Sequence, residues 1–136
     1  MSENYAKLDP GAAARWASSI TDGALRNKAL SAVSESWSET NPTEAAKWVG
    51  SLQDVQVRDI ATVAFSEGLA RENPASAAQW ALSISDPVQR RSSLSSIVYN
   101  WKKIDPNAAR AFVLSSTAIS EDERKDLILL TGLEPA

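Results

Sequence analysis

The chain of 136 residues contains no cysteine and no histidine. The absence of thiols excludes disulfides and cysteine nucleophiles, and the absence of imidazoles excludes histidine bases, Cys/His zinc sites and histidine-ligated haem. With only 5 Gly, the sequence has no glycine-rich phosphate loop and no Gly-x-Ser-x-Gly turn. Because the familiar sets of catalytic residues are missing, we expect neither an enzyme nor a cofactor or metal.

The sequence also lacks a large excess of positive or negative charge, and it lacks long apolar runs. The 14 Lys and Arg against 17 Asp and Glu give a net charge of −3, so nucleic acid is not an expected partner. No apolar run approaches the roughly 18 residues that cross a bilayer, and the start, residues 1–5, lacks the basic and apolar regions of a signal peptide. We therefore expect no membrane insertion of this segment, and a cytoplasmic location is favoured.

The sequence does have 22 Ala and an internal repeat. An Asp or Asn followed by Pro recurs every 32 residues, at Asp9-Pro10, Asn41-Pro42, Asn73-Pro74 and Asp105-Pro106. An aromatic residue follows each dipeptide at a constant distance, as Trp16, Trp48, Trp80 and Phe112. The predicted organisation is one helical-repeat domain over residues 1–136, made of a partial repeat 1–8, the repeats 9–40, 41–72 and 73–104, and a divergent C-terminal repeat 105–136.

Each unit predicts two antiparallel helices. The Asp or Asn followed by Pro is typical of an N-cap and the first helical position, and a second cap follows at Asp22, Asp54 and Asp86. Apolar residues at helical spacing give each helix one buried face. Units that bury one face each must stack on their neighbours. The predicted fold class is therefore all-α, an α-solenoid of about four stacked antiparallel helix-turn-helix repeats with a 32-residue period.

The repeated aromatic residues lie at the centre of these apolar faces. Evenly spaced rings also suit stacking on bases or caging of cations, but their position favours a core between repeats for Trp16, Trp48, Trp80 and Phe112. The corresponding position in the second helices is occupied by Trp37, Leu69 and Trp101, and Trp37 and Trp101 are assigned to the core on the same argument.

An Asp and an Arg four residues later also recur, as Asp22/Arg26, Asp54/Arg58 and Asp86/Arg90. Such a pair suits an anion site or an acid with an electrophile. A catalytic site is normally built once, whereas this pair occurs in each of the first three units. We therefore interpret the Asp as a helix cap, and the Arg as a partner of that Asp or of the carbonyl end of the first helix.

The two ends of the chain depart from the repeat. In the fourth unit, Ser120 and Glu123 form a capping box before a helix that begins near Glu121, and Arg124 takes the Arg position. The acidic run Glu121-Asp122-Glu123 is interpreted as the dipole-favoured first turn of that helix. This unit is predicted to be a C-terminal cap, although residues 133–136 resemble the start of another unit. The N-terminal partial repeat is either the remainder of a longer array or a natural half-repeat cap.

The residues that vary from unit to unit on the first helices are the candidate partner-binding face. In solenoids such residues line a continuous concave surface that suits an extended peptide or a partner helix. A merely solvated face is the alternative. The candidate residues are Arg15, Thr43, Glu44, Lys47, Ser76, Gln79 and Asn107.

In architecture the chain resembles the α-solenoid class of tetratricopeptide-like and HEAT-like repeats. The motif differs in detail, because a tetratricopeptide unit has 34 residues and a Trp-x-x-Leu-Gly-x-x-Tyr signature, whereas this unit reads Asp/Asn-Pro-x-x-Ala-Ala-x-Trp, and it looks like a bacterial type of Ala/Trp repeat. The resemblance implies a non-enzymatic protein- or peptide-binding scaffold module, either alone or within a longer array. The alternatives are a structural spacer without its own ligand and, third, an enzyme that uses carboxylates and Arg.

Overall fold

The structure, a computed structural model, describes residues 10–132, in which every regular element is a helix and no strand occurs. It contains eight helices there, which alternate between short and long before a final helix of intermediate length. They are α2 (Pro10–Ser19), α3 (Gly23–Thr40), α4 (Pro42–Ser51), α5 (Val55–Ala70), α6 (Pro74–Ala81), α7 (Pro87–Ile104), α8 (Pro106–Ser115) and α9 (Glu121–Thr131).

The predicted caps begin the helices. Asn41, Asn73 and Asp105 accept hydrogen bonds from backbone N–H groups at the starts of α4, α6 and α8, over 3.3, 3.1 and 3.1 Å. Asp22, Asp54 and Asp86 cap α3, α5 and α7 in the same way. Ser120 caps α9 by accepting from the Glu123 N–H at 3.2 Å, as the capping box predicts. Asp9, the fourth predicted cap of this kind, lies outside the described residues.

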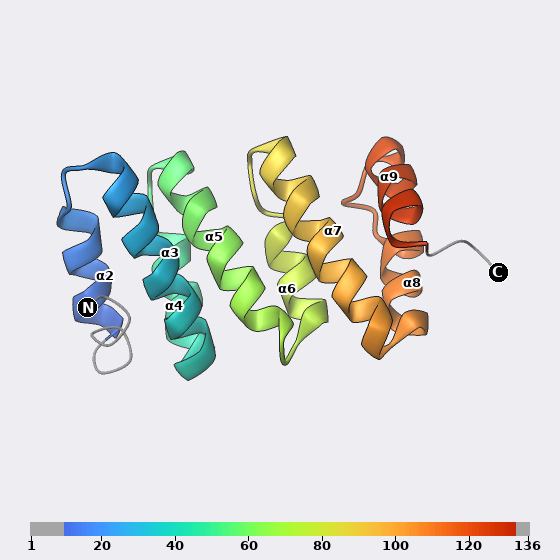
Figure 1. Ribbon diagram of the computed structural model, residues 1–136, viewed down its shortest axis with the longest axis horizontal. Coiled ribbons are helices and arrows are strands. Elements are labelled where there is room, and N and C mark those ends of the chain that lie inside the picture. Colours follow the sequence, from blue (N-terminus) through green and yellow to red (C-terminus); the bar gives the residue numbers. More distant parts are fainter. Residues whose placement is uncertain (1–9, 133–136) are drawn as a thin grey trace.

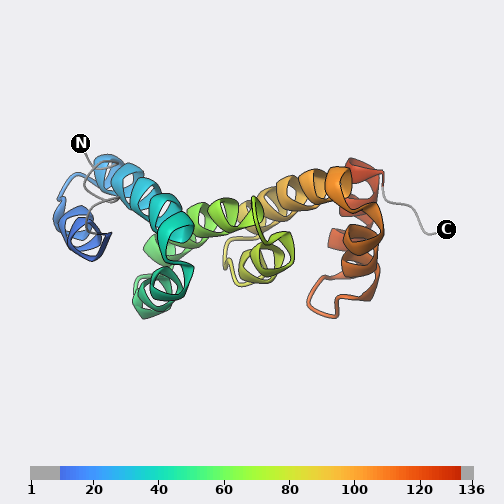
Figure 2. The same cartoon turned by 90° about the horizontal axis from the view of Figure 1, so that it is seen from below.

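The helices follow one another along the long axis in chain order, from α2 at one end to α9 at the other (Figure 1). The long helices α3, α5 and α7 form one row, and the short helices α4, α6 and α8 all project from the same side of that row (Figure 2). Neighbouring long helices pack on each other, and each short helix packs mainly on the long helices beside it. The short helices are thus held apart by the long ones rather than forming a continuous surface of their own.

The buried side chains form three clusters distributed along this row. One joins α2 to α3, a second joins α4 to α5, and the largest unites α6 to α9. Trp37 and Trp48 contact the first two clusters, and Leu69 contacts the second and the third. These residues therefore connect the local cores into one apolar interior.

The predicted aromatic core is confirmed at three of its four short-helix positions. Trp48, Trp80 and Phe112 are half-buried, and each ring packs against an aromatic ring on the long helix that precedes it in the chain. Trp16, also predicted as core, is instead 45% exposed. Within residues 10–132 no aromatic ring packs on Trp16, whereas each of its three counterparts packs on a ring of a long helix. In the second helices, Trp101 is buried as expected and Trp37 is half-buried.

Two of the three repeated arginines, Arg58 and Arg90, contact the carbonyl ends of the preceding short helices, as a structural role predicts. The first, Arg26, makes no such contact in residues 10–132, and its Nε is buried without a hydrogen-bond partner. Arg58 donates to the Leu52 carbonyl at 3.4 Å and Arg90 to the Ile84 carbonyl at 3.1 Å. In the longer turn before α9, Arg124 donates to the carbonyls of Ser116 and Ile119 at 2.9 and 3.2 Å. Within residues 10–132, no ion pair joins a cap Asp to the Arg one turn later. The Asp and Arg therefore act separately.

The last helix, α9, packs on α7 and α8. It carries two exposed apolar residues, Leu129 at 81% and Leu130 at 62%, and Leu130 lines a hollow beside the start of α7. A capping repeat normally exposes polar residues at its free face, so these two leucines differ from what the predicted C-terminal cap requires. The partial repeat 1–8 and the segment 133–136 lie outside the described residues. Among the helices of residues 10–132, none combines the length and apolar character that crossing a bilayer requires.

Candidate binding groove

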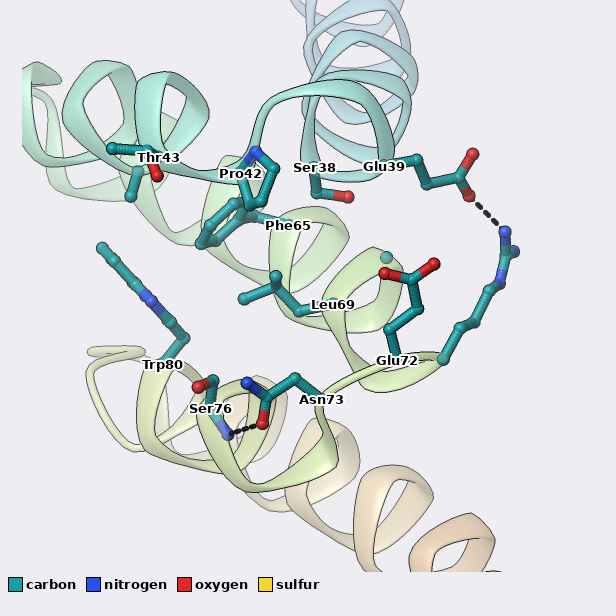
Figure 3. A pocket seen from close by; sticks show the side chains of 13 residues that line it. Ser38, Glu39, Pro42, Thr43, Phe65, Leu69, Glu72, Asn73, Ser76 and Trp80 are labelled. Carbon is teal, nitrogen blue, oxygen red and sulfur yellow. Dashed lines mark hydrogen bonds and ion pairs between the residues drawn. The ribbon is translucent and has the colours of Figure 1, made fainter.

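A cavity of about 510 Å³ lies between α4 and α6, with α5 as its base (Figure 3). We call it the central groove. Its apolar wall consists of Pro42, Ala46, Phe65, Leu69 and Trp80. Its polar rim comes from the end of α3, the starts of α4 and α6, and the end of α5. The rim residues are Ser38, Glu39, Thr43, Arg71, Glu72, Asn73 and Ser76.

The groove is open because the aromatic series in the long helices is broken at Leu69. Trp37 and Trp101 lie 32 residues before and after it. Trp37 packs on Trp48 with ring centroids 5.6 Å apart, and Trp101 packs on Phe112 at 5.7 Å. At the central junction the smaller Leu69 leaves space beside Trp80, the aromatic residue of α6.

A second difference accompanies the first, one turn earlier on α5. Phe65 stands where the flanking long helices have Val33 and Ile97. Its ring meets the ring of Trp80 edge-on, with centroids 5.0 Å apart and planes at 88°. An edge-to-face pair of this kind is favourable. Compared with α3 and α7, the large aromatic side chain of α5 therefore lies one turn closer to the helix N-terminus. The groove opens toward the C-terminal end of α5.

Close packing of α3 on α5 shapes the floor of the groove. A Cβ atom added at Gly68 would lie 1.9 Å from the Ser38 Oγ and 3.2 Å from the Glu35 carbonyl oxygen. Only a residue without a side chain fits there. The Ser38 hydroxyl donates to that same carbonyl at 2.6 Å. A hydrogen bond within α3 therefore holds the Ser38 side chain at this contact.

The rim at the C-terminal end of α5 is rich in carboxylates. Arg71 donates to Glu35 on α3 at 3.0 Å and is also paired with Glu39. Glu72 has no ion pair or side-chain hydrogen bond among the described residues. Figure 3 shows Glu39 and Glu72 at one end of the groove and Trp80 at the other. The cavity thus combines an aromatic end with an acidic end.

Of the seven candidate residues from the sequence, two line the groove, namely Thr43 on α4 and Ser76 on α6. The other five do not line it. Lys47 is exposed and paired with Glu44 at 3.5 Å on the outer side of α4, and Asn107 accepts from Arg110 at 3.2 Å on α8. Arg15 and Gln79 are exposed on α2 and α6. The candidate face is therefore distributed over separate short helices.

Sequence reasoning missed Leu69, Arg71 and Glu72 as site residues and assigned Trp80 to the core alone. The available signal was the interruption of the Trp37 to Trp101 series at Leu69. A small residue in a large-residue series indicates open volume, but only the packing of four helices shows which residues surround it.

Comparison with protein-family models, with curated protein sequences and with solved structures finds no significant match. Function is therefore argued from the groove itself. In the part of the chain that the structure describes, no cluster of three or more acidic side chains has the arrangement of a metal site.

A second acidic position lies on the long-helix row. Glu67 on α5 lines shallow hollows beside α7. Its partial burial, and secondarily the neighbouring charge of Glu35, raise the pKa of Glu67 above its ordinary value. Because these hollows, of about 420 and 360 Å³, are smaller and shallower than the central groove, the groove remains the stronger candidate for a binding site.

Proposed function

We propose that the chain is an α-solenoid of 32-residue helical pairs that serves as a non-enzymatic protein- or peptide-binding module, with the central groove as its binding site. The observation that carries the proposal is the opening of this groove at Leu69, where the flanking junctions have a Trp. The groove lies on α5, the middle one of the three long helices α3, α5 and α7.

The size and chemistry of the groove suit part of a polypeptide. Its volume of about 510 Å³ lies in the range of pockets that enclose side chains or small ligands. The wall of Phe65, Leu69 and Trp80 favours burial of an apolar side chain. Thr43 and Ser76 on the rim supply hydroxyl groups that can bond a peptide backbone. A few large apolar side chains in such a groove typically provide most of the affinity of a peptide.

Two variants test this proposal. The first, Phe65→Ile with Leu69→Trp, copies the pair Ile97 and Trp101 of the neighbouring long helix, and we call it the filled-groove variant. Because it reproduces a packing that the chain already uses, we expect it to fold. The matched control, Arg15→Glu with Lys47→Glu and Gln79→Glu, alters exposed short-helix residues that do not line the groove.

A random peptide library displayed on phage is selected on the wild-type protein, and the enriched peptides are titrated against all three proteins. We expect binding near the micromolar range, about 8 kcal/mol, to wild type and control, and at least about tenfold weaker binding to the filled-groove variant. Circular dichroism verifies equal helicity. Enriched peptides that lose affinity only for the control would move the site to the predicted short-helix face. Failure to enrich any peptide would favour the spacer.

A further inference from the structure

We propose that the polypeptide bound in the central groove presents an aromatic side chain flanked by Lys or Arg. This inference rests on the proposed function and specifies its ligand. It follows from two properties of the groove, the ring that is missing at Leu69 and the charge of the rim.

The protein itself indicates the shape of the missing group. At the flanking junctions an indole from the long helix packs against the next short helix, Trp37 on Trp48 at 5.6 Å and Trp101 on Phe112 at 5.7 Å. At the central junction the corresponding side chain is Leu69. Trp80 already has a ring partner in Phe65, but the volume that an indole occupies at the neighbouring junctions is open beside Leu69. An aromatic ring from a partner would fill that volume and give Trp80 a second ring contact.

An aromatic ligand also suits the half-buried state of Trp80. One contact of its ring is the edge-on pair with Phe65, and the indole still lines the open cavity. Aromatic pairs with centroids 4.5–7 Å apart contribute roughly 0.5–1.5 kcal/mol beyond the buried area. A ligand ring would therefore gain more here than an aliphatic side chain of similar size.

The charge of the rim selects a basic neighbour for this ring. Arg71 is already occupied by Glu35 and Glu39 on α3, so an acidic ligand would have to displace those carboxylates. Glu72 has no cationic partner among residues 10–132. A Lys or Arg next to the bound ring gains an ion pair with Glu72.

Helix ends at the rim carry partial charges of both signs. α3 and α5 end there, whereas α4 and α6 begin there, and helix N- and C-terminal ends carry partial positive and partial negative charge. The charge preference therefore rests on the carboxylate of Glu72, unpaired among the described residues, and complementary charge of this kind accelerates association and disfavours acidic peptides.

The test uses three fluorescein-labelled peptides with the same Gly/Ser frame. One has a Trp between two Lys residues, the second a Trp between two Glu residues, and the third an Ala between two Lys residues. Each is titrated by fluorescence anisotropy against the wild type, the filled-groove variant, Glu72→Gln and Glu72→Lys. Asp122→Asn removes an exposed charge on α9, which lies well apart from α4 and α5 (Figure 1), and is the matched control for a lost carboxylate.

We expect the Trp/Lys peptide to bind wild type at least about tenfold more tightly than either of the other peptides. Glu72→Gln should weaken its binding about threefold to tenfold, Glu72→Lys should weaken it further, and Asp122→Asn should leave it unchanged. Filling the groove should remove the advantage of Trp over Ala. Equal binding of the Trp/Lys and Ala/Lys peptides, or equal binding of the Trp/Lys peptide to wild type and filled-groove protein, would overturn the inference.

Failure of this inference can be distinguished from failure of the proposed function. If the Trp/Glu peptide binds wild type as tightly as the Trp/Lys peptide, and both are lost in the filled-groove variant, the groove binds peptides but the predicted charge preference is wrong. If none of the three peptides binds while library peptides bind in the groove, the aromatic-basic ligand is wrong and the binding function stands. If the library also yields nothing, both are wrong.

Discussion

The carboxylate of Asp59, on α5, accepts a hydrogen bond from the backbone N–H of Asp86, the N-cap of α7, at 3.1 Å. Its other oxygen accepts from the Ser85 N–H at 2.9 Å. Asp59 is only 5% exposed. One buried side chain thus holds the turn between α6 and α7 against the preceding long helix, and this fixes the position of α6 along one side of the central groove.

Replacing this carboxylate should destabilise the fold. Asp59→Asn removes one acceptor and places an amide N–H group opposite a backbone N–H group, and leaving a buried donor unpaired costs about 1–3 kcal/mol. Chemical denaturation followed by circular dichroism measures the loss. The control is Asp122→Asn, an exposed acidic residue in the first turn of α9, for which we expect a change below about 0.5 kcal/mol. Equal stability of Asp59→Asn and wild type would contradict the role assigned to Asp59.

The close approach of α3 and α5 predicts opposite effects for two glycine substitutions. Gly68→Ala should destabilise the protein by about 1–3 kcal/mol, because the added Cβ collides with Ser38 and with the backbone of α3. Gly50→Ala on α4, where a Cβ meets nothing within 4 Å, should stabilise it by roughly 0.5–1 kcal/mol through helix propensity.

Thermal denaturation of the single variants and of Gly68→Ala with Ser38→Ala measures these effects. The double variant should recover part of the loss, since it removes the Ser38 hydroxyl closest to the new Cβ. If Gly68→Ala were as stable as Gly50→Ala, the proposed tight contact between α3 and α5 would be incorrect.

The ion pair between Arg90 on α7 and Glu123 on α9, at 3.2 Å, predicts an acid-sensitive contribution to stability. Burial by itself would raise the pKa of Glu123, but the hydrogen bond and charge of Arg90, together with Ser120, outweigh burial and hold the pKa below its ordinary value. A lowered folded-state pKa contributes stability above the unfolded pKa of about 4.3, and that stability is lost as the pH falls through the lower folded value.

Glu123→Gln should therefore be less stable than wild type near pH 7, and the difference should decline with acidification below about pH 4. Denaturation midpoints measured across this range provide the test. A difference that stays constant with pH would show that the pair contributes through packing rather than through charge.

Glu67 predicts a pH dependence of stability opposite to that of Glu123. Burial, and then the charge of Glu35, raise the pKa of Glu67, so the folded state binds this proton more tightly than the unfolded state. The associated stability is complete below the unfolded pKa of about 4.3 and is lost as the pH rises through the higher folded value. Glu67→Gln should consequently be more stable than wild type near pH 7 and similar to it near pH 3. A variant that is less stable than wild type near neutral pH would refute this.

The helices and their caps could be predicted from the sequence because they depend on local patterns. A cap such as Asn73 followed by Pro74 specifies a helix start through residues within one turn of it. The carbonyl contacts of Arg58 and Arg90 were predictable for the same reason, since each Arg lies only six residues from the carbonyl it contacts.

The groove and the Asp59 bond could not be predicted, because they depend on segments far apart in the chain. Asp59 contacts residues 26 and 27 positions later, and its side chain falls in a helix pattern where a polar residue predicts exposure. Leu69 was visible as an exception to the Trp series, yet its meaning required the positions of α4 and α6. Trp16 matched its counterparts in pattern, but no aromatic ring packs on it in residues 10–132.

The most direct test of a peptide-binding groove is the indole N–H signal of Trp80 in ¹H–¹⁵N NMR spectra during titration with the Trp/Lys peptide, with Trp80→Phe used to assign the signal. Trp16, exposed on α2, serves as the internal reference within the same spectra. We expect the Trp80 signal to shift and saturate while the Trp16 signal stays in place, and we expect no shift of the Trp80 signal in the filled-groove variant. A saturating shift at Trp16 with an unchanged Trp80 signal would place peptide binding on α2 and exclude the central groove.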